Sequence, residues 1–183
     1  MLSTLWARNF VVDYTIVEAK PWHCGQMSRL LRREHQMALG DCQTHKALRA
    51  AFDESGFRRA CIVDGKIIAL WGLVSPEASA YGVVWLAMAN GIEKYPLALI
   101  KEVRHQIAEM MLVKRMLVCT VLEEDKAAQR FAIFLGFVPK HDEGYAPPAQ
   151  SRFGRREIAR KLDETESLAL PNATGRVRVM VYR

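Results

Sequence analysis

The dipeptide Asp64-Gly65 separates two apolar runs, Arg59–Val63 and Lys66–Val74, and constrains the fold more than any other feature of the chain. A tight two-residue hairpin turn needs positive φ angles, which Asp and Gly adopt more readily than most residues. The two runs are therefore predicted to be neighbouring antiparallel strands. A further run, Tyr81–Ala89, is apolar throughout, which indicates a strand in the middle of a sheet.

Helices are predicted before this hairpin. After a short strand at Asp13–Glu18, Pro21 opens a helix that continues to the break at Gly40-Asp41, and a second helix runs to about Ser55-Gly56. The first helix is expected to turn its apolar side inward and its arginines toward water. The inward residues are Met27, Leu30, Leu31 and Met37 in the first helix and Leu48, Ala51 and Phe52 in the second; the outward ones are Arg29, Arg32 and Arg33.

The chain after Tyr81–Ala89 alternates between helix and strand. A helix beginning near Pro96 leads to a short buried strand at Met116–Val121. Asp125 is expected to cap the next helix, Gly136 to end it, and Phe137-Val138 to begin another strand. Since a helix joins Tyr81–Ala89 to Met116–Val121, these two strands must be parallel. The residues expected to face inward are Leu97, Ile100, Val103, Ile107 and Met110 in the first helix and Ala128, Phe131 and Leu135 in the second.

The element order predicts an α/β fold with a mixed sheet of six or seven strands. With 183 residues, of which half are hydrophobic and a quarter charged, the composition is that of an ordinary globular protein of about one domain plus an appendage. We expect an N-terminal segment at 1–12, a domain at 13–144 and a C-terminal arm at 145–183. No apolar stretch reaches the roughly 20 residues that span a bilayer, and the N-terminus lacks a signal-peptide pattern.

Cysteine spacing predicts free thiols. Cys24, Cys42, Cys61 and Cys119 form no CxxC pair and lie far apart in the chain. His23 stands beside Cys24, but adjacent helical residues point in different directions. We therefore predict no metal site.

The C-terminal arm is basic. From Tyr145 onward, eight basic and four acidic residues give a net charge of +4 out of +6 for the whole chain. An arm docked on an acidic protein partner or left in solvent is favoured over nucleic-acid stacking, because few aromatic residues accompany the arginines. Non-specific DNA contact stays an alternative. Either the final run Val177–Tyr182 returns to the sheet as a strand, or neighbouring subunits hold the arm.

The segment Asp125–Phe137 resembles a signature of the GNAT superfamily of N-acetyltransferases. That signature reads roughly Asn-x-x-Ala-x-x-Leu-Tyr-x-x-Leu-Gly-Phe, and the resemblance covers about residues 13–140. It implies a GNAT-like, mixed, mostly antiparallel central sheet flanked by helices, with a C-terminal extension. The matching residues are Ala128, Phe131, Leu135, Gly136 and Phe137.

The cofactor loop departs from the family pattern. In GNAT enzymes the fourth strand leads into an Arg/Gln-x-x-Gly-x-Gly/Ala loop whose N–H groups hold the pyrophosphate of coenzyme A. The equivalent stretch here keeps only Gly91, places Glu93 near the expected polyanion, and contains Pro96, which has no N–H. Lys94 is a single point charge in place of a ring of amides. We therefore expect no acetyl-CoA binding in the usual manner.

The catalytic positions of the family are also altered. Its frequent general acid is a tyrosine, and Ala132 stands in that place and cannot donate a proton. His105 is expected to be a surface residue. We predict no catalytic residue. In the alternative interpretation, Glu77 or Tyr81 removes a proton, while Gly91, Lys94 and the amides around Leu97 hold acetyl-CoA.

Further segments are similar to a GNAT-like group of tailed-phage proteins that includes internal virion protein A of short-tailed phages. This resemblance implies a virion structural or assembly protein in the capsid interior or the tail and portal region. Its partners would be portal, tail or internal proteins and copies of itself, in the virion and, during assembly, in the host cytoplasm. The alternative is an acetyl-CoA-dependent N-acetyltransferase with a variant loop. The similar segments are Ile67–Gly72, Val84–Leu86, Tyr95–Arg104, Arg130-Phe131 and Leu135-Gly136.

Overall fold

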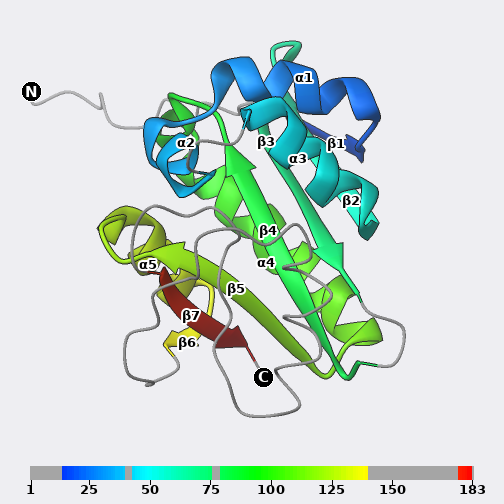
Figure 1. Ribbon diagram of the computed structural model, residues 1–183, viewed down its shortest axis with the longest axis vertical. Coiled ribbons are helices and arrows are strands. Elements are labelled where there is room, and N and C mark those ends of the chain that lie inside the picture. Colours follow the sequence, from blue (N-terminus) through cyan, green and yellow to red (C-terminus); the bar gives the residue numbers. More distant parts are fainter. Residues whose placement is uncertain (1–13, 40–42, 76–78, 140–176, 183) are drawn as a thin grey trace, which may run out of the picture.

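The computed structural model describes residues 14–39, 43–75, 79–139 and 177–182. Within these ranges seven strands form one sheet in the order β1-β2-β3-β4-β5-β7-β6 (Figure 1). The pair β4–β5 is parallel and the other neighbouring pairs are antiparallel. The predicted α/β class with a mixed, mostly antiparallel sheet is confirmed. The strands are β1 (Tyr14–Glu18), β2 (Ser55–Val63), β3 (Lys66–Val74), β4 (Tyr81–Met88), β5 (Met116–Leu122), β6 (Val138–Pro139) and β7 (Val177–Tyr182).

Helices cover both faces of the sheet. Alternate residues of β3 and β4 enter two separate apolar clusters, as expected for a sheet buried on both sides. One cluster includes side chains of α1 and α3, and the other includes side chains of α4 and α5. Figure 1 shows α3 in front of the sheet and α4 behind it. The helices are α1 (Pro21–Leu30), α2 (Arg33–Leu39), α3 (Thr44–Asp53), the short 3₁₀ helix η1 (Ile92–Lys94), α4 (Pro96–Val113) and α5 (Lys126–Phe134).

The hairpin between β2 and β3 forms as the sequence predicts. Asp64 and Gly65 have φ angles of 49° and 72°, the positive values that a tight two-residue turn needs. The strand before the turn is longer than expected, because β2 begins at Ser55. The preceding helix α3 correspondingly ends at Asp53 and not at Ser55-Gly56.

The prediction of one continuous helix from Pro21 to Gly40 is wrong. Leu31 leaves the helical conformation with φ −57° and ψ 136°, so α1 and α2 are separate helices. Leu31 itself is buried, but Leu30 and Met37 are 40% and 51% exposed and do not face the core. The reason is tertiary: Leu31 forms an isolated bridge with Ala89, just beyond β4.

The predicted crossover between the parallel strands is confirmed. Helix α4 joins β4 to β5, and Asp125 caps α5 by accepting a hydrogen bond from the Ala128 N–H at 2.9 Å. Gly136 follows α5 with φ 103°, where a residue with a Cβ would be strained. In α4, Ile107 and Met110 are buried as expected; the side chains of Leu97 and Ile100 lie outside the described part.

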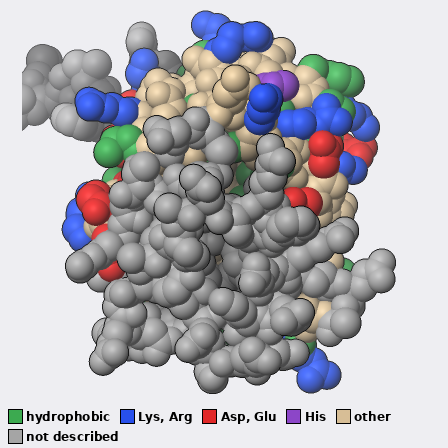
Figure 2. Space-filling model, viewed as in Figure 1, with side chains coloured by type: hydrophobic (Ala, Val, Ile, Leu, Met, Phe, Trp, Pro, Cys, Tyr) green, Lys and Arg blue, Asp and Glu red, His purple; other side chains and the backbone are tan. Residues whose placement is uncertain are grey.

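The end of the chain belongs to the sheet. Strand β7 lies between β5 and β6, and Met180 is fully buried. Of the two alternatives for Val177–Tyr182, the return to the sheet is the one observed. The remaining residues of the basic arm, and the N-terminal segment, lie outside the described residues and are grey in Figure 2. Among the helices that the structure describes, none combines the length and the hydropathy needed to cross a bilayer.

Candidate functional site

The two parallel strands in the middle of the sheet separate after a short contact. Strand β4 pairs with β5 only from Tyr81 to Val83, opposite Met116 to Val118. Both strands continue beyond this point, β4 to Met88 and β5 to Leu122, and Figure 1 shows them diverging. A gap therefore opens in the centre of the sheet.

The separation leaves backbone groups of β4 without a strand partner. Alternate residues of a strand direct their N–H and C=O groups toward opposite neighbours. Ala89 donates its N–H to the Ile68 carbonyl at the β3 side (2.9 Å), so Leu86 directs its groups to the other side, toward β5. Since the β4–β5 pairing ends at Val83, Leu86 has no strand partner there within the described ranges.

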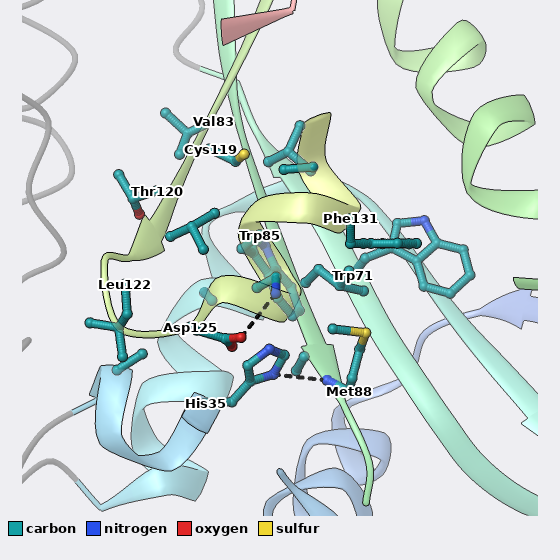
Figure 3. A pocket seen from close by; sticks show the side chains of 18 of the residues that line it. His35, Trp71, Val83, Trp85, Met88, Cys119, Thr120, Leu122, Asp125 and Phe131 are labelled. Carbon is teal, nitrogen blue, oxygen red and sulfur yellow. Dashed lines mark hydrogen bonds between the residues drawn. The ribbon is translucent and has the colours of Figure 1, made fainter. Parts of the chain in front are cut away.

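A cavity of about 250 Å³ lies at this gap. Its wall combines side chains from both faces of the sheet, such as Trp85 and Leu48 with one cluster and Trp71 and Ile107 with the other. The lining is mostly apolar, with polar residues that include His35 and Asp125, which lie near one another in Figure 3. Such a cavity suits an apolar group that is held by few, well-placed hydrogen bonds.

The break between α1 and α2 lines one end of the gap. Arg32 donates its backbone N–H to the Met88 carbonyl at 3.0 Å, and Asn90 donates its N–H to the Leu30 carbonyl at 2.8 Å. The segment Leu30–Arg32 thus pairs with the end of β4 on the side that β5 has left. This pairing satisfies backbone groups that burial would otherwise make costly.

His35 continues this contact with its side chain. Its Nδ1 accepts a hydrogen bond from the Met88 N–H at 3.1 Å, as Figure 3 shows. Burial, with a smaller contribution from the Arg32 guanidinium, lowers the pKa of His35 from 6.5 to about 4. The ring is therefore neutral near pH 7, and because Nδ1 accepts, its proton is on Nε2.

Asp125 connects α5 to the same region. One carboxylate oxygen caps α5, and the other lies 3.9 Å from Nη2 of Arg32, which is also 3.4 Å from Glu34. The Asp125 side chain is only 5% exposed, so this charge needs such partners. The expectation that Arg32 faces water is wrong, because its side chain is 16% exposed and reaches toward Asp125.

Most backbone N–H groups of the loop between β4 and α4 donate hydrogen bonds to carbonyls of the chain. Gly91 adopts a left-handed conformation (φ 84°) and begins η1. Of the six N–H groups from Asn90 to Tyr95, four already donate to carbonyls of the chain: those of Asn90, Ile92, Lys94 and Tyr95. Within this loop, at most two main-chain donors, those of Gly91 and Glu93, are left for a ligand.

In the alternative catalytic interpretation, the residues expected to hold acetyl-CoA and the tyrosine expected to remove a proton lie at opposite ends of β4. Gly91 and Lys94 lie in the β4–α4 loop, and Leu97 lies in the first turn of α4. Tyr81 begins β4 at its other end, about 23 Å from Met88 at about 3.3 Å per strand residue. Glu77 lies outside the described residues.

Other positions that the sequence analysis singled out have structural roles or surface positions. Ala132 is buried and lines the cavity, so the position of the family's tyrosine faces the site but holds no proton donor. His23 accepts a hydrogen bond from the Lys20 N–H at 2.9 Å at the start of α1. The His105 side chain is 67% exposed, as predicted.

The described cysteines are free thiols, and Cys42 lies outside the described part. Cys119 lines the cavity, and burial raises its pKa to about 12. Burial also raises the pKa of Cys61, to about 11. Both thiols are therefore protonated and poorly reactive near neutral pH. Within the described ranges, no group of three or more His, Cys, Asp or Glu residues is placed to hold a metal ion.

The sequence does not indicate that His35, Arg32 and Asp125 lie together. Asp125 carries a local signal as a helix cap, but nothing near it in the sequence indicates that Arg32 or His35 approaches it. The three residues meet because α2 and α5 both pack at the gap between β4 and β5.

Comparisons with known proteins show the fold. No family model and no curated protein matches the sequence. A GNAT-family acetyltransferase from Streptococcus pneumoniae matches with a TM-score of 0.55 at 15% identity, over 92% of this chain and 98% of that one. The ribosomal-protein-S18-alanine N-acetyltransferase from Escherichia coli matches with a TM-score of 0.59 at 14% identity, over 93% of each chain.

A Salmonella typhimurium protein, solved with its cofactor acetyl-CoA, gives a TM-score of 0.59 at 10% identity over 93% of each chain. At these identities the matches show a GNAT-like fold and leave activity open. The chain therefore has the fold that its Asp125–Phe137 segment predicts.

Proposed function

We propose that this GNAT-fold chain acts by contact with other macromolecules and does not transfer acetyl groups from acetyl-CoA held in the usual manner. The observation that carries the proposal is the β4–α4 loop, where four of six N–H groups already have carbonyl acceptors. A pyrophosphate needs several convergent donors, which helix N-termini and glycine-rich loops supply as free N–H groups.

The residues of the loop do not fit a pyrophosphate. To free the amides of Ile92, Lys94 and Tyr95, η1 would have to unwind and lose its hydrogen bonds. Pro96 supplies no N–H at the start of α4, and the Glu93 carboxylate would repel the phosphates. Lys94 is the only basic residue between Asn90 and Pro96. One lysine does not replace the missing donors.

The altered general-acid position supports the same proposal. Where the family has a tyrosine, Ala132 is buried in the cavity wall. A methyl group cannot give a proton to a leaving thiolate, so this common route to acetyl transfer is missing.

Isothermal titration calorimetry with acetyl-CoA tests the proposal. We expect no saturable heat up to millimolar cofactor for the intact chain. A micromolar dissociation constant that Lys94→Ala abolishes and Lys46→Ala leaves unchanged would refute it. Lys46 is a suitable control because it is exposed on α3, outside the cavity lining and the loop.

For the partner we propose other components of a phage particle, namely portal, tail or internal virion proteins. What supports this part is the similarity of segments such as Ile67–Gly72 and Tyr95–Arg104 to the phage group described above. The test is quantitative mass spectrometry of phage particles purified from cultures of the phage that encodes this chain. The chain should sediment with particles at a fixed copy number; recovery only in the particle-free fraction would contradict it.

The second candidate function is an N-acetyltransferase with a variant cofactor loop. It is favoured by the separation of β4 and β5. The backbone groups of Leu86, which have no strand partner there, could bind the extended, amide-bearing arm of acetyl-CoA beside the apolar cavity. Release of free thiol from acetyl-CoA in the presence of an amine panel distinguishes it. Amine-dependent release that is lost in Tyr81→Phe would favour this candidate over the first.

A further inference from the structure

Helix α1 carries apolar side chains on both of its faces. On the inner face, Cys24 and Met27 are fully buried. On the outer face, Trp22 and Leu30 are 63% and 40% exposed, with the exposed Gln26 between them. Residues at four-residue spacing share one face of a helix, so these three side chains form a row along α1. A helix that is apolar all round is typical of one that is covered on both sides.

The neighbouring helices extend this outer surface. In α2, Met37 is 51% exposed and follows the exposed Arg33 by one turn. Helix α3 packs beside α1, with Cys24 Sγ 3.9 Å from the Leu48 carbonyl oxygen, and Lys46 is exposed on it. Figure 2 shows Lys and Arg side chains gathered in the upper part of the molecule, over α1 and α3. The outer helical face is defined by Trp22, Arg29, Leu30, Arg33, Met37 and Lys46.

The positive charges of the outer helical face exceed what its carboxylates neutralise. The carboxylate of α2, Glu34, lies 3.4 Å from Arg32, and that of α3, Asp53, pairs with Arg49 at 2.8 Å. The exposed cations of this face that make no ion pair within the described ranges are Arg29, Arg33 and Lys46. A row of apolar side chains beside unpaired cations is complementary to a partner that presents apolar groups flanked by carboxylates.

The row on α1 indicates the shape of that partner. Side chains at four-residue spacing form the ridge that packs between the ridges of a second helix. From Trp22 to Leu30 this ridge is about 12 Å long at about 1.5 Å per residue, a little more than two helical turns. Trp, Met and Arg are also residue types that are enriched at protein interfaces.

Two other occupants fit the outer helical face less well. A second copy of the chain, in a two-fold contact, would bring the same positive face onto itself, with Arg29 and Arg33 on both sides. A nucleic acid would gain from the cations, but the face has one aromatic side chain, Trp22, on which a base can stack, and its other apolar side chains offer nothing to phosphate.

We propose that the outer helical face binds an acidic amphipathic helix of another protein. The apolar side of that helix packs on Trp22 and Leu30, and its carboxylates lie against Arg29 and Arg33. The inference rests on the proposed function, that the chain acts by contact with other macromolecules, and adds the surface and the chemistry of the partner.

Site-specific photo-cross-linking in purified phage particles tests the proposal. The photoreactive residue p-benzoylphenylalanine replaces Trp22, and the control position is Leu112, which is 87% exposed on α4. Mass spectrometry identifies the cross-linked segments.

A charge-reversal variant of the cross-linking chain carries Arg29→Glu and Arg33→Glu. Its matched control carries Arg115→Glu and Lys126→Glu, the same change of charge at exposed residues outside the outer helical face. Circular dichroism melting confirms that each variant is folded.

The expected result is cross-linking from position 22 to a segment of another protein that has carboxylates and apolar residues three or four positions apart. The yield should fall roughly 5- to 10-fold in Arg29→Glu/Arg33→Glu and less than about twofold in the control variant. Cross-links to a copy of the chain or to nucleic acid would overturn the proposal, and so would a yield no higher at position 22 than at position 112.

The two proposals fail in different ways. Particles that hold the chain at a fixed copy number without the expected cross-links refute this inference and leave the proposed function standing. Recovery of the chain only in the particle-free fraction refutes the proposed virion partner, and this inference with it.

Discussion

The His35 side chain provides the sharpest test of how the gap beside β4 is closed. Its Nδ1 accepts the Met88 N–H at 3.1 Å in a half-buried setting, so the side chain must be neutral to do so. Replacement by Ala leaves that N–H without an acceptor, whereas Asn places a carbonyl oxygen near the position of Nδ1. We expect His35→Ala to lower the free energy of unfolding by about 1–3 kcal/mol at pH 7 and His35→Asn to lower it less.

The same contact predicts a pH dependence. The pKa of His35 is about 4 in the folded chain, against 6.5 as its ordinary value. Between these two values the unfolded chain binds more protons than the folded one. The free energy of unfolding therefore rises with pH, and the contribution of His35 to it is lost as the pH falls from 6.5 toward 4. The depression corresponds to about 3 kcal/mol in total, an upper figure because the side chain is not fully buried. The charged groups acting on the ring are Arg32, which lowers its pKa, and Asp125 and Glu34, which raise it.

Urea unfolding of the intact chain and of His35→Asn at pH 7.0 and 5.0 measures this contribution. Burial also lowers the pKa of His23, but that residue is present in both proteins, and the difference between them isolates His35. The intact chain should lose about 1–2 kcal/mol more than the variant over this interval. Equal losses in the two proteins would refute the burial of a neutral His35 against Met88.

Three further predictions concern the packing around the sheet. Gly136→Ala should lower the free energy of unfolding by about 1–3 kcal/mol, because φ is 103° and a Cβ would lie 2.8 Å from the Tyr182 ring; Gly56→Ala, with nothing within 4 Å, is the control in thermal melts. Asp125→Ala should cost about 1–2 kcal/mol through loss of the α5 cap, and a loss as large in Asp125→Asn would contradict that origin. Cys119 is half-buried and desolvation raises its pKa to about 12, so it should react with iodoacetamide at pH 8 far more slowly in the folded chain than in urea; equal rates by mass spectrometry would contradict the raised pKa.

Local signals in the sequence predict much of the fold. The hairpin at Asp64-Gly65 depends on the φ angles of two residues, and the caps at Asp125 and Gly136 depend on their immediate neighbours. The parallel pairing of β4 and β5 follows from the helix between them. These features need no knowledge of distant contacts, which is why they are confirmed.

The break at Leu31 could not be predicted in the same way. The apolar pattern continues through it, and only the pairing of Leu30–Arg32 with the end of β4 interrupts the helix. The burial of Arg32 follows from the same break, since its partner Asp125 lies more than ninety residues further along the chain.

The residues at the family's cofactor and general-acid positions can be read from the sequence, but their arrangement cannot. The absence of a glycine pair around Gly91 and the presence of Ala132 are visible in the sequence. The hydrogen bonds of the loop amides within the chain are not visible there, because they depend on η1, and neither is the cavity at the gap between β4 and β5. Both depend on how strands and helices pack.

Hydrogen exchange of the β4–α4 loop, followed by NMR with and without coenzyme A, tests the central claim most directly. If the amides of Ile92, Lys94 and Tyr95 are held by carbonyls of the chain, they should exchange more slowly than those of Gly91 and Glu93, and coenzyme A should leave all five rates unchanged. Fast exchange of the three amides in the free protein, with protection gained on adding coenzyme A, would contradict the claim.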